Sequence, residues 1–295
     1  MSHGSSYNFL GHDGVAMIKN ESFYFANYFD WIFLKHKIIK KSNNPKHAYI
    51  KINFLRRYLK DILSIKNEFI LVSGCGDSSP IIEFPEESRK ILELPNLKKW
   101  YAENNLLEHP KMFSLSVGFA THTVEYEKYL ISLNKKINIY EKKDKIMSCF
   151  RTQKTNINGN QYLERPFASK FINNNKSYIE SYLPSMGQYD FLKTLSQYKW
   201  CFCPLGNGCD HAPKLLECLF LKTIPIAKKN YNSYNLYKNY PIIWIDNFDV
   251  ILDEQILQYD YNIDWDKIIS EFTCEYWFKK IINEDHRQEK QNLVC

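Results

Sequence analysis

The chain has 295 residues, of which 44% are hydrophobic and 24% charged, proportions typical of a globular protein with one large or two medium domains. The net charge of +6 is mild, and no stripe of Lys and Arg with interleaved aromatic residues occurs, which argues against a nucleic acid partner. No secretory signal or membrane-spanning run is found, and the eight cysteines form no CxxC pair. The composition therefore predicts a cytoplasmic protein with free thiols, no membrane span and no metal site, and it leaves the oligomeric state open.

The first half of the chain alternates apolar strands with amphipathic helices. Ala48 to Ile52 is expected to form a strand, and Phe54 to Ile65 has its apolar residues at helical spacing. Glu68 to Ser73 is a continuous apolar run of the kind buried in parallel sheets, and it ends in a tight loop, Gly74 to Pro80. Further elements are expected at Ser88–Leu94, Leu97–Glu103, Lys111–Val117 (a strand) and Thr123–Leu133 (a helix).

A polar, lysine-rich stretch from Asn134 to Lys145 is the expected linker between two domains, 1–140 and 141–295. After it the alternation restarts, and the last helix could pack back on the first domain. Repeated βαβ units place strands in parallel sheets with helices on both faces. The sequence thus predicts an α/β protein with two Rossmann-like domains facing each other across a cleft. The second half is expected to contain strands at Lys145–Phe150, Lys199–Cys203, Thr223–Ala227 and Ile242–Ile245, and helices at Leu163–Leu183, Tyr189–Tyr198, near Asp253 and at Asp264–Ile282.

The stretch from Lys199 to Lys228 carries the clearest functional pattern, because it reads as strand, glycine turn, helix and strand. Gly206 and Gly208 allow the backbone to approach a ligand closely. Asp210 is expected to be the N-cap of the helix, with Pro213 in its first turn. A glycine turn that leads from a strand into a helix N-terminus is a common anion-binding arrangement.

Lys214 and Glu217 share the polar face of the same helix. In one interpretation, the lysine meets the diphosphate of a nucleotide and the glutamate accepts hydrogen bonds from ribose hydroxyls. In the other, the two residues form an ordinary i,i+3 ion pair on an amphipathic helix. The spacing alone leaves both open.

Three residues of the first half are candidates for a general base: Asp77, His109 and His122. The loop that holds Asp77 lacks the third glycine of a dinucleotide-binding motif. Asp77 instead follows a buried strand, at the edge where open α/β sheets bind ligands, and a carboxylate there can act as a base. The alternative is an Asx-turn residue that closes the loop. The alternative for each histidine is an ordinary surface or capping residue, which is the more common role of a single histidine.

Arg151, Lys154 and Arg165 cluster after the first strand of the second half, where arginine could bind a diphosphate through its fork of donors. A solvated polar loop is the alternative. Asp264-Trp265-Asp266 is a literal DxD, but it opens a helix, where acidic residues cap the terminus and match its dipole. No metal is therefore required.

A set of residues in the second half follows in a fixed order: Phe202-Cys203-Pro204, Gly206, Gly208, Asp210, Glu217 and Ile224-Pro225-Ile226. A weaker set upstream runs from Asn96 to Asn104 and continues in His109-Pro110-Lys111. In these motifs the chain resembles the exostosin-like glycosyltransferases of the GT-B fold. Two positions depart from the family pattern, since Lys214 stands in place of an arginine and Thr223 in place of a glycine.

The resemblance implies a UDP-sugar donor and inverting, metal-independent transfer of a pentose such as xylose, or of a hexose, to a hydroxyl of a glycan acceptor. It implies no cofactor besides the donor. Asp77 is the leading base in this assignment, followed by His122. The residues expected to bind the nucleotide sugar are Arg151, Lys154, Arg165, Gly206, Asn207, Gly208, Asp210, His211, Lys214 and Glu217.

The Lys-, Asn- and Ile-rich composition and the missing membrane helix also resemble the glycosyltransferases encoded by large DNA viruses, which implies a place in the host cytoplasm. Two alternatives to a UDP-sugar enzyme stay open. One is a GDP-fucose-dependent, fucosyltransferase-like enzyme, and the other is a non-catalytic nucleotide- or glycan-binding protein with the same fold.

Overall fold

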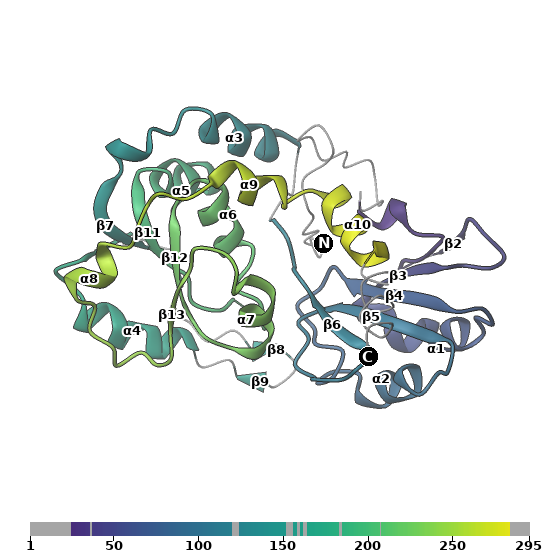
Figure 1. Ribbon diagram of the computed structural model, residues 1–295. Coiled ribbons are helices and arrows are strands. Elements are labelled where there is room, and N and C mark those ends of the chain that lie inside the picture. The colour runs from purple at the N-terminus through teal and green to yellow at the C-terminus, as the bar shows by residue number, and fades with distance from the viewer. Residues whose placement is uncertain are drawn as a thin grey trace, which may run out of the picture.

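The computed structural model describes residues 25–35, 37–119, 124–151, 156–157, 160–161, 164–182, 185–206 and 208–283. These residues form a mixed α/β structure with a six-stranded sheet, a five-stranded sheet and one short hairpin. Figure 1 shows the two sheets in separate halves of the molecule, each with its own helices. The predicted α/β class with two parallel-strand sheets is thereby confirmed. None of the described helices has the length and apolar character needed to cross a membrane.

The first sheet has the strand order β2-β1-β3-β4-β5-β6, and all neighbours are parallel except β1 and β2. The predicted apolar strand at Glu68–Ser73 corresponds to β4, whose six residues are all buried, as expected for a central parallel strand. The strands are β1 (Trp31–Phe33), β2 (Ile38–Lys40), β3 (His47–Lys51), β4 (Phe69–Gly74), β5 (Leu97–Glu103) and β6 (Met112–Leu115).

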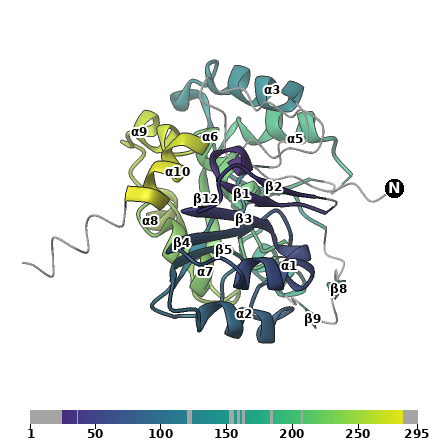
Figure 2. The same cartoon turned by 90° about the vertical axis from the view of Figure 1, so that its right-hand side faces the viewer.

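Helices cover both faces of the first sheet (Figure 2). One face packs against α1 (Leu55–Leu63) and α2 (Pro85–Leu92). The other face packs against η1 (Phe25–Tyr28) and the last helix, α10 (Cys274–Asn283). Trp277 and Ile281 of α10 are buried there, so the chain returns to the first sheet after it has built the second.

The second sheet has the order β10-β7-β11-β12-β13, and all its neighbours are parallel. Because β10 and β11 lie on opposite sides of β7, the direction of the connections reverses between β7 and β11. Open α/β sheets bind ligands beyond the carboxyl ends of the strands at such a switch point. The strands are β7 (Lys143–Ser148), β10 (Ile179–Ser181), β11 (Tyr198–Phe202), β12 (Ile224–Lys228) and β13 (Ile243–Ile245), and the hairpin is β8 (Asn156–Ile157) with β9 (Asn160–Gln161).

Helix α3 precedes the predicted linker but belongs to the second core. Its residues Tyr126 and Leu130 share one buried cluster with side chains of β11 and α6, as do Val117 and Phe119. The core therefore changes near Val117 rather than near 140. The elements around the second sheet are α3 (Val124–Asn134), η3 (Ile139–Glu141), α4 (Glu164–Asn174), α5 (Gln188–Leu195), α6 (Lys214–Phe220), α7 (Tyr231–Tyr237), α8 (Glu254–Leu257) and α9 (Trp265–Ser270), while η2 (Ile52–Phe54) precedes α1.

Two predicted helices are wrong in extent. The helix expected over Leu163–Leu183 ends at Asn174, because the side chain of Asn175 donates to Phe171 O (2.8 Å) and to Val250 O (3.0 Å) and closes the helix; β10 follows. The helix expected over Asp264–Ile282 is divided into α9 and α10, since Thr273 Oγ1 accepts from Tyr276 N (3.2 Å) and starts a second helix.

The capping interpretation of Asp264 is confirmed. Its Oδ1 accepts a hydrogen bond from Lys267 N (3.0 Å), three residues on, at the start of α9. This is the usual geometry of an N-cap carboxylate.

Candidate functional site

A cavity of about 160 Å³ lies where the carboxyl ends of β4, β5 and β6 meet the loop after β11. We call it the small cavity. Five of the predicted site residues border it, and they come from both halves of the chain. The lining residues are Asp77, Asn104, Val117, Arg165, Gly206, Gly208, Asp210, Ala212 and Pro213.

Asp77 is carried by a loop whose backbone is held by a buried carboxylate. Glu103, the last residue of β5, accepts a hydrogen bond from Cys75 N at its Oε2 (2.8 Å). Cys75 has a φ of 61°, a left-handed conformation that is uncommon for a residue with a side chain. A Cβ on Gly74 would lie 2.4 Å from Glu103 Oε1, so any larger residue there would displace the carboxylate that binds the loop. The loop therefore holds its shape around Glu103 and directs Asp77 to the small cavity.

Glu103 is a site residue that the sequence reasoning missed. Burial raises the pKa of its carboxyl well above the usual range, and the neighbouring charges of Asp210 and Asp77 raise it further. The only sequence signal is an acid at the end of an apolar strand, at the same edge of the sheet as the Asp77 loop.

Asn104 joins the two halves of the molecule. Its Nδ2 donates to Gly76 O (3.0 Å) in the first half, and its Oδ1 accepts from Cys209 N (2.7 Å) in the second. A Cβ on Gly208 would lie 2.5 Å from Asn104 Oδ1. Gly208 thus lacks a side chain where Asn104 packs against the loop, which allows the contact between the halves. From the sequence, the same glycine was expected to let a ligand approach the backbone.

Asp210 has a different role from the predicted helix cap. Helix α6 begins after Pro213, which makes no side-chain capping bond. Asp210 instead accepts from Val117 N (3.0 Å) and from Tyr237 OH (2.9 Å) at Oδ2, and from Ala212 N (3.1 Å) at Oδ1. Burial raises the pKa of this carboxyl. Three long-range or loop donors therefore outcompete the local capping bond, and the N-cap prediction is wrong.

The basic side of the small cavity is formed by Arg165. Its Nε donates to Leu205 O (2.9 Å), and the adjacent Glu164 accepts from Leu205 N (2.9 Å), so the start of α4 holds both polar groups of this peptide. Arg165 Nη1 reaches Arg151 O (3.5 Å), which brings two of the predicted phosphate-binding residues together. Burial lowers the pKa of Arg165, although arginine stays charged in proteins.

Lys214 and Glu217 lie on α6, next to the switch point but outside the lining of the small cavity. Lys214 Nζ donates to Cys149 O (2.5 Å) at the end of β7. Glu217 is buried and accepts a hydrogen bond from Tyr126 OH of α3. Burial raises the pKa of Glu217 to about 6. The carboxylate that the sequence assigned to ribose thus already has a hydroxyl donor within the protein.

His211 is fully buried beside the same loop. Its Nδ1 lies 2.9 Å from Ser233 Oγ, and its Nε2 lies 3.6 Å from Glu164 Oε1. This position leaves the imidazole no exposed atom with which to meet a phosphate in the conformation described. The predicted site residues His122, Lys154 and Asn207 lie outside the described residues.

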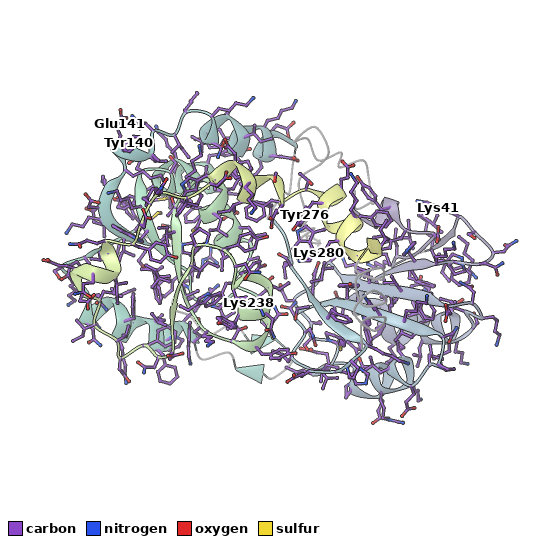
Figure 3. The ribbon with its side chains drawn as sticks, in the orientation of Figure 1. Lys41, Tyr140, Glu141, Lys238, Tyr276 and Lys280 are labelled. Carbon is purple, nitrogen blue, oxygen red and sulfur yellow. The ribbon has the colours of Figure 1, made fainter. Side chains whose placement is uncertain are left out.

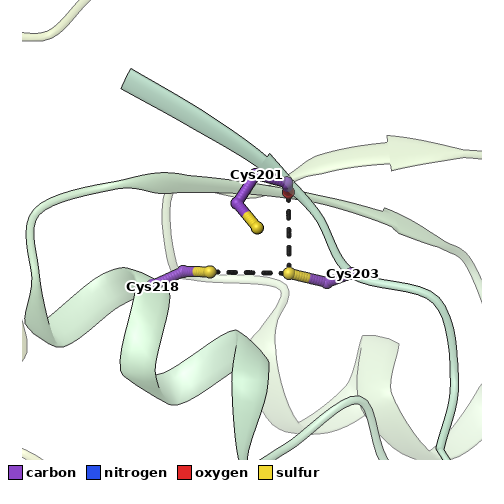
Figure 4. A group of neighbouring side chains, drawn as sticks. All are labelled: Cys201, Cys203 and Cys218. Carbon is purple, nitrogen blue, oxygen red and sulfur yellow. Dashed lines mark hydrogen bonds between the residues drawn. The ribbon is translucent and has the colours of Figure 1, made fainter. Parts of the chain in front are cut away.

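Three thiols form the most compact group of metal-type ligands in the described part of the chain. The sulfur atoms of Cys201, Cys203 and Cys218 lie within 4.8 Å of one another between β11 and α6 (Figure 4). Burial raises the pKa of the Cys203 and Cys218 thiols, whereas hydrogen bonds from those two thiols lower the pKa of Cys201, so only one of the three favours the thiolate form that binds metal. A closed structural zinc site takes four ligands, so this group of three fits hydrogen-bonded core thiols better than a zinc centre.

No protein-family model matches the chain, and no curated protein matches it significantly. The two halves together bring an acid, an arginine and a glycine turn to the small cavity, and a lysine and a glutamate to the switch point beside it.

Proposed function

We propose that the protein is a glycosyltransferase of the GT-B arrangement that moves a sugar from a UDP-sugar to a hydroxyl of a glycan acceptor, with inversion and without a metal ion. The observation that carries this proposal is that Asp77 of the first half and Arg165 of the second border the same cavity. An acid and a fixed guanidinium at the same cavity match the two needs of glycosyl transfer, a base for the acceptor and a cation for the leaving diphosphate.

In the proposed mechanism, Asp77 takes the proton from the acceptor hydroxyl as its oxygen attacks the anomeric carbon. The bond from that carbon to the diphosphate oxygen breaks, and the negative charge that develops there is stabilised by Arg165, with Arg151 and Lys214 nearby. Inversion follows because attack and departure occur on opposite faces of the same carbon.

The size of the small cavity limits what it holds. Its volume of about 160 Å³ is below the roughly 300 Å³ of typical ligand pockets, so it accommodates the transferred sugar and the leaving oxygen rather than a whole nucleotide sugar. The nucleoside is then expected along the switch point between β7 and β11, over α6. There Glu217 would exchange the Tyr126 hydroxyl for those of the ribose.

The test is nucleotide binding followed by turnover, on the full chain. UDP should raise the melting temperature, because a ligand that binds only the folded state stabilises it. UDP-sugars should be hydrolysed slowly without acceptor. Arg165→Ala should weaken UDP binding at least tenfold, since a hydrogen bond to a charged group contributes about 1.5–3 kcal/mol. Arg57→Ala, which removes an exposed arginine on α1, is the matched control.

Asp77→Asn separates binding from chemistry. It should leave UDP binding within a factor of about two and lower turnover by about 10²- to 10⁴-fold, the usual contribution of a general base. A melting shift with GDP in place of UDP would redirect the assignment to a fucosyltransferase-like enzyme. Binding without hydrolysis or transfer would identify a nucleotide-binding protein that is not an enzyme, and no shift with either nucleotide would refute the proposal.

A further inference from the structure

A second, larger cavity of about 810 Å³ lies between the halves of the molecule. We call it the large cavity. Its walls come from β5, β6 and the loop between them in the first half, from α7 and the two residues between β12 and α7 in the second, and from α10. It shares no lining residue with the small cavity. Asn104 borders the small cavity and its neighbour Asn105 borders the large one. The two cavities therefore lie on either side of the contact that Asn104 makes between the halves.

Aromatic rings dominate the apolar part of the large cavity: Tyr101, Phe113, Tyr231, Tyr234 and Trp277. Tyr101 and Phe113 are stacked, with ring centroids 5.3 Å apart and planes 29° apart. Tyr231 is 39% exposed, so its ring is available to a ligand without disturbance of the core. Flat rings of this kind provide apolar contact area together with a polar edge for hydrogen bonding.

Amide and imidazole groups supply the polar part of the same wall, from Asn105, His109, Asn230 and Asn235. Asn230 caps α7, where its Oδ1 accepts from Ser233 N (2.8 Å). Its Nδ2 is buried and has no hydrogen-bond partner among the described residues.

The charges around the large cavity are few and dispersed. Lys229 lies over the ring of Tyr234 (4.1 Å) and Lys280 over that of Trp277 (4.7 Å), so both ammonium groups are held against aromatic faces. Glu108 is the acidic counterpart. Lys280 comes from α10, the helix that returns to the first sheet (Figure 3). No arginine is among the lining residues, so a phosphate ligand would find no bidentate guanidinium partner here.

We propose that the large cavity binds an oligosaccharide, at a site separate from the small cavity. A saccharide combines apolar ring faces with many hydroxyl groups, and it needs aromatic surfaces, amide donors and acceptors, and little charge. The volume lies within the roughly 300–1,000 Å³ of typical ligand pockets. The inference does not require the proposed transferase activity, because the two cavities have no lining residue in common.

The experiment titrates the full chain calorimetrically with four tetrasaccharides: xylotetraose, cellotetraose, chitotetraose and a heparin-derived tetrasaccharide. At least one of the three neutral probes should bind, and Tyr231→Ala should weaken its binding at least tenfold. Lys280→Ala is a second cavity variant and should weaken binding of the same probe. Binding of the heparin fragment alone would point to charge attraction rather than to the aromatic cavity and would overturn the inference. Tyr140→Ala is the control, since Tyr140 is 90% exposed and lies at the far end of the second half (Figure 3).

The variants of the small cavity keep this inference distinguishable from the proposed function. Arg165→Ala and Asp77→Asn should leave tetrasaccharide binding unchanged, and Tyr231→Ala should leave the UDP-induced melting shift unchanged. Binding that is lost in Arg165→Ala but kept in Tyr231→Ala would put the saccharide in the small cavity and overturn the inference. Binding of none of the four probes would overturn it as well.

Discussion

The pairing of Glu217 with Tyr126 makes a quantitative prediction for the variant Glu217→Gln. Burial raises the pKa of this carboxyl from 4.5 to about 6. The native state therefore binds the proton at a higher pH than the unfolded chain does. The stabilising contribution of the protonated group is fully present below pH 4.5 and is lost as pH rises to about 6. A difference of about 1.5 pKa units corresponds to about 2 kcal/mol of free energy of unfolding.

Gln keeps the shape of the side chain and an oxygen that accepts from Tyr126 OH, but it does not ionise. As pH rises from 4.5 to about 7, the free energy of unfolding of Glu217→Gln should therefore increase by about 2 kcal/mol relative to that of the wild type. The assay is urea unfolding of both proteins across this range. The control is Glu141→Gln, which changes an exposed glutamate on η3 (Figure 3) and should show no such trend.

A difference between wild type and Glu217→Gln that stays constant with pH would refute the reasoning, because the carboxyl would then not be penalised by burial. The same series with saturating UDP adds a functional reading. Ribose hydroxyls that donate to Glu217 would favour its charged form and reduce the pH dependence of the wild type.

Two further predictions concern the buried polar groups that hold the two halves in shape. Lys142 is buried with its Nζ hydrogen-bonded to Tyr198 O, Leu221 O and Thr223 Oγ1, and burial lowers its pKa to about 7. Above that pH the unfolded chain binds more protons than the native state, so the unfolding free energy of the wild type relative to Lys142→Met should rise by roughly 1 kcal/mol per pH unit between about pH 7 and 9. A difference that does not change with pH would contradict the lowered pKa. Asn104→Ala should lower the free energy of unfolding by roughly 2–4 kcal/mol, because it removes both hydrogen bonds of the side chain and places alanine at a φ of 53°. Asn104→Gly, measured by the same urea unfolding, should lower it by about 1 kcal/mol less, because glycine adopts a positive φ without strain. Equal losses in the two variants would show that the backbone conformation contributes nothing.

The order of elements around the proposed nucleotide site was predictable from the sequence because the signals are local. The apolar run at the end of β11, the glycines after it and the leucine spacing of α6 each depend on neighbouring residues only. The same holds for Asp264, whose capping bond reaches three residues along the chain. The structure agrees with these local patterns because no residue distant in the sequence replaces the local contacts on which they depend.

The missed features depend on contacts between distant parts of the chain. Asp210 fits a helix cap by its position, yet its partners Val117 and Tyr237 come from other elements. Glu103 acts on the Cys75 amide, 28 residues upstream. Helix α3 was assigned to the first domain by sequence order, whereas Tyr126 reaches Glu217 in the second. No periodicity in the sequence records these pairings.

Because α10 packs on the first sheet, folding of that sheet during synthesis depends on a segment that is made after the second sheet. Tyr49 and Val72 on that face share one buried cluster with Trp277 and Ile281 of α10. During synthesis, which proceeds from the N-terminus, this face of the first sheet cannot be completed until the residues of α10 have left the ribosome. A fragment that stops before α10 would leave this apolar sheet face covered mainly by η1 among the described elements, so aggregation rather than an independent first domain is the expected fate of a premature stop.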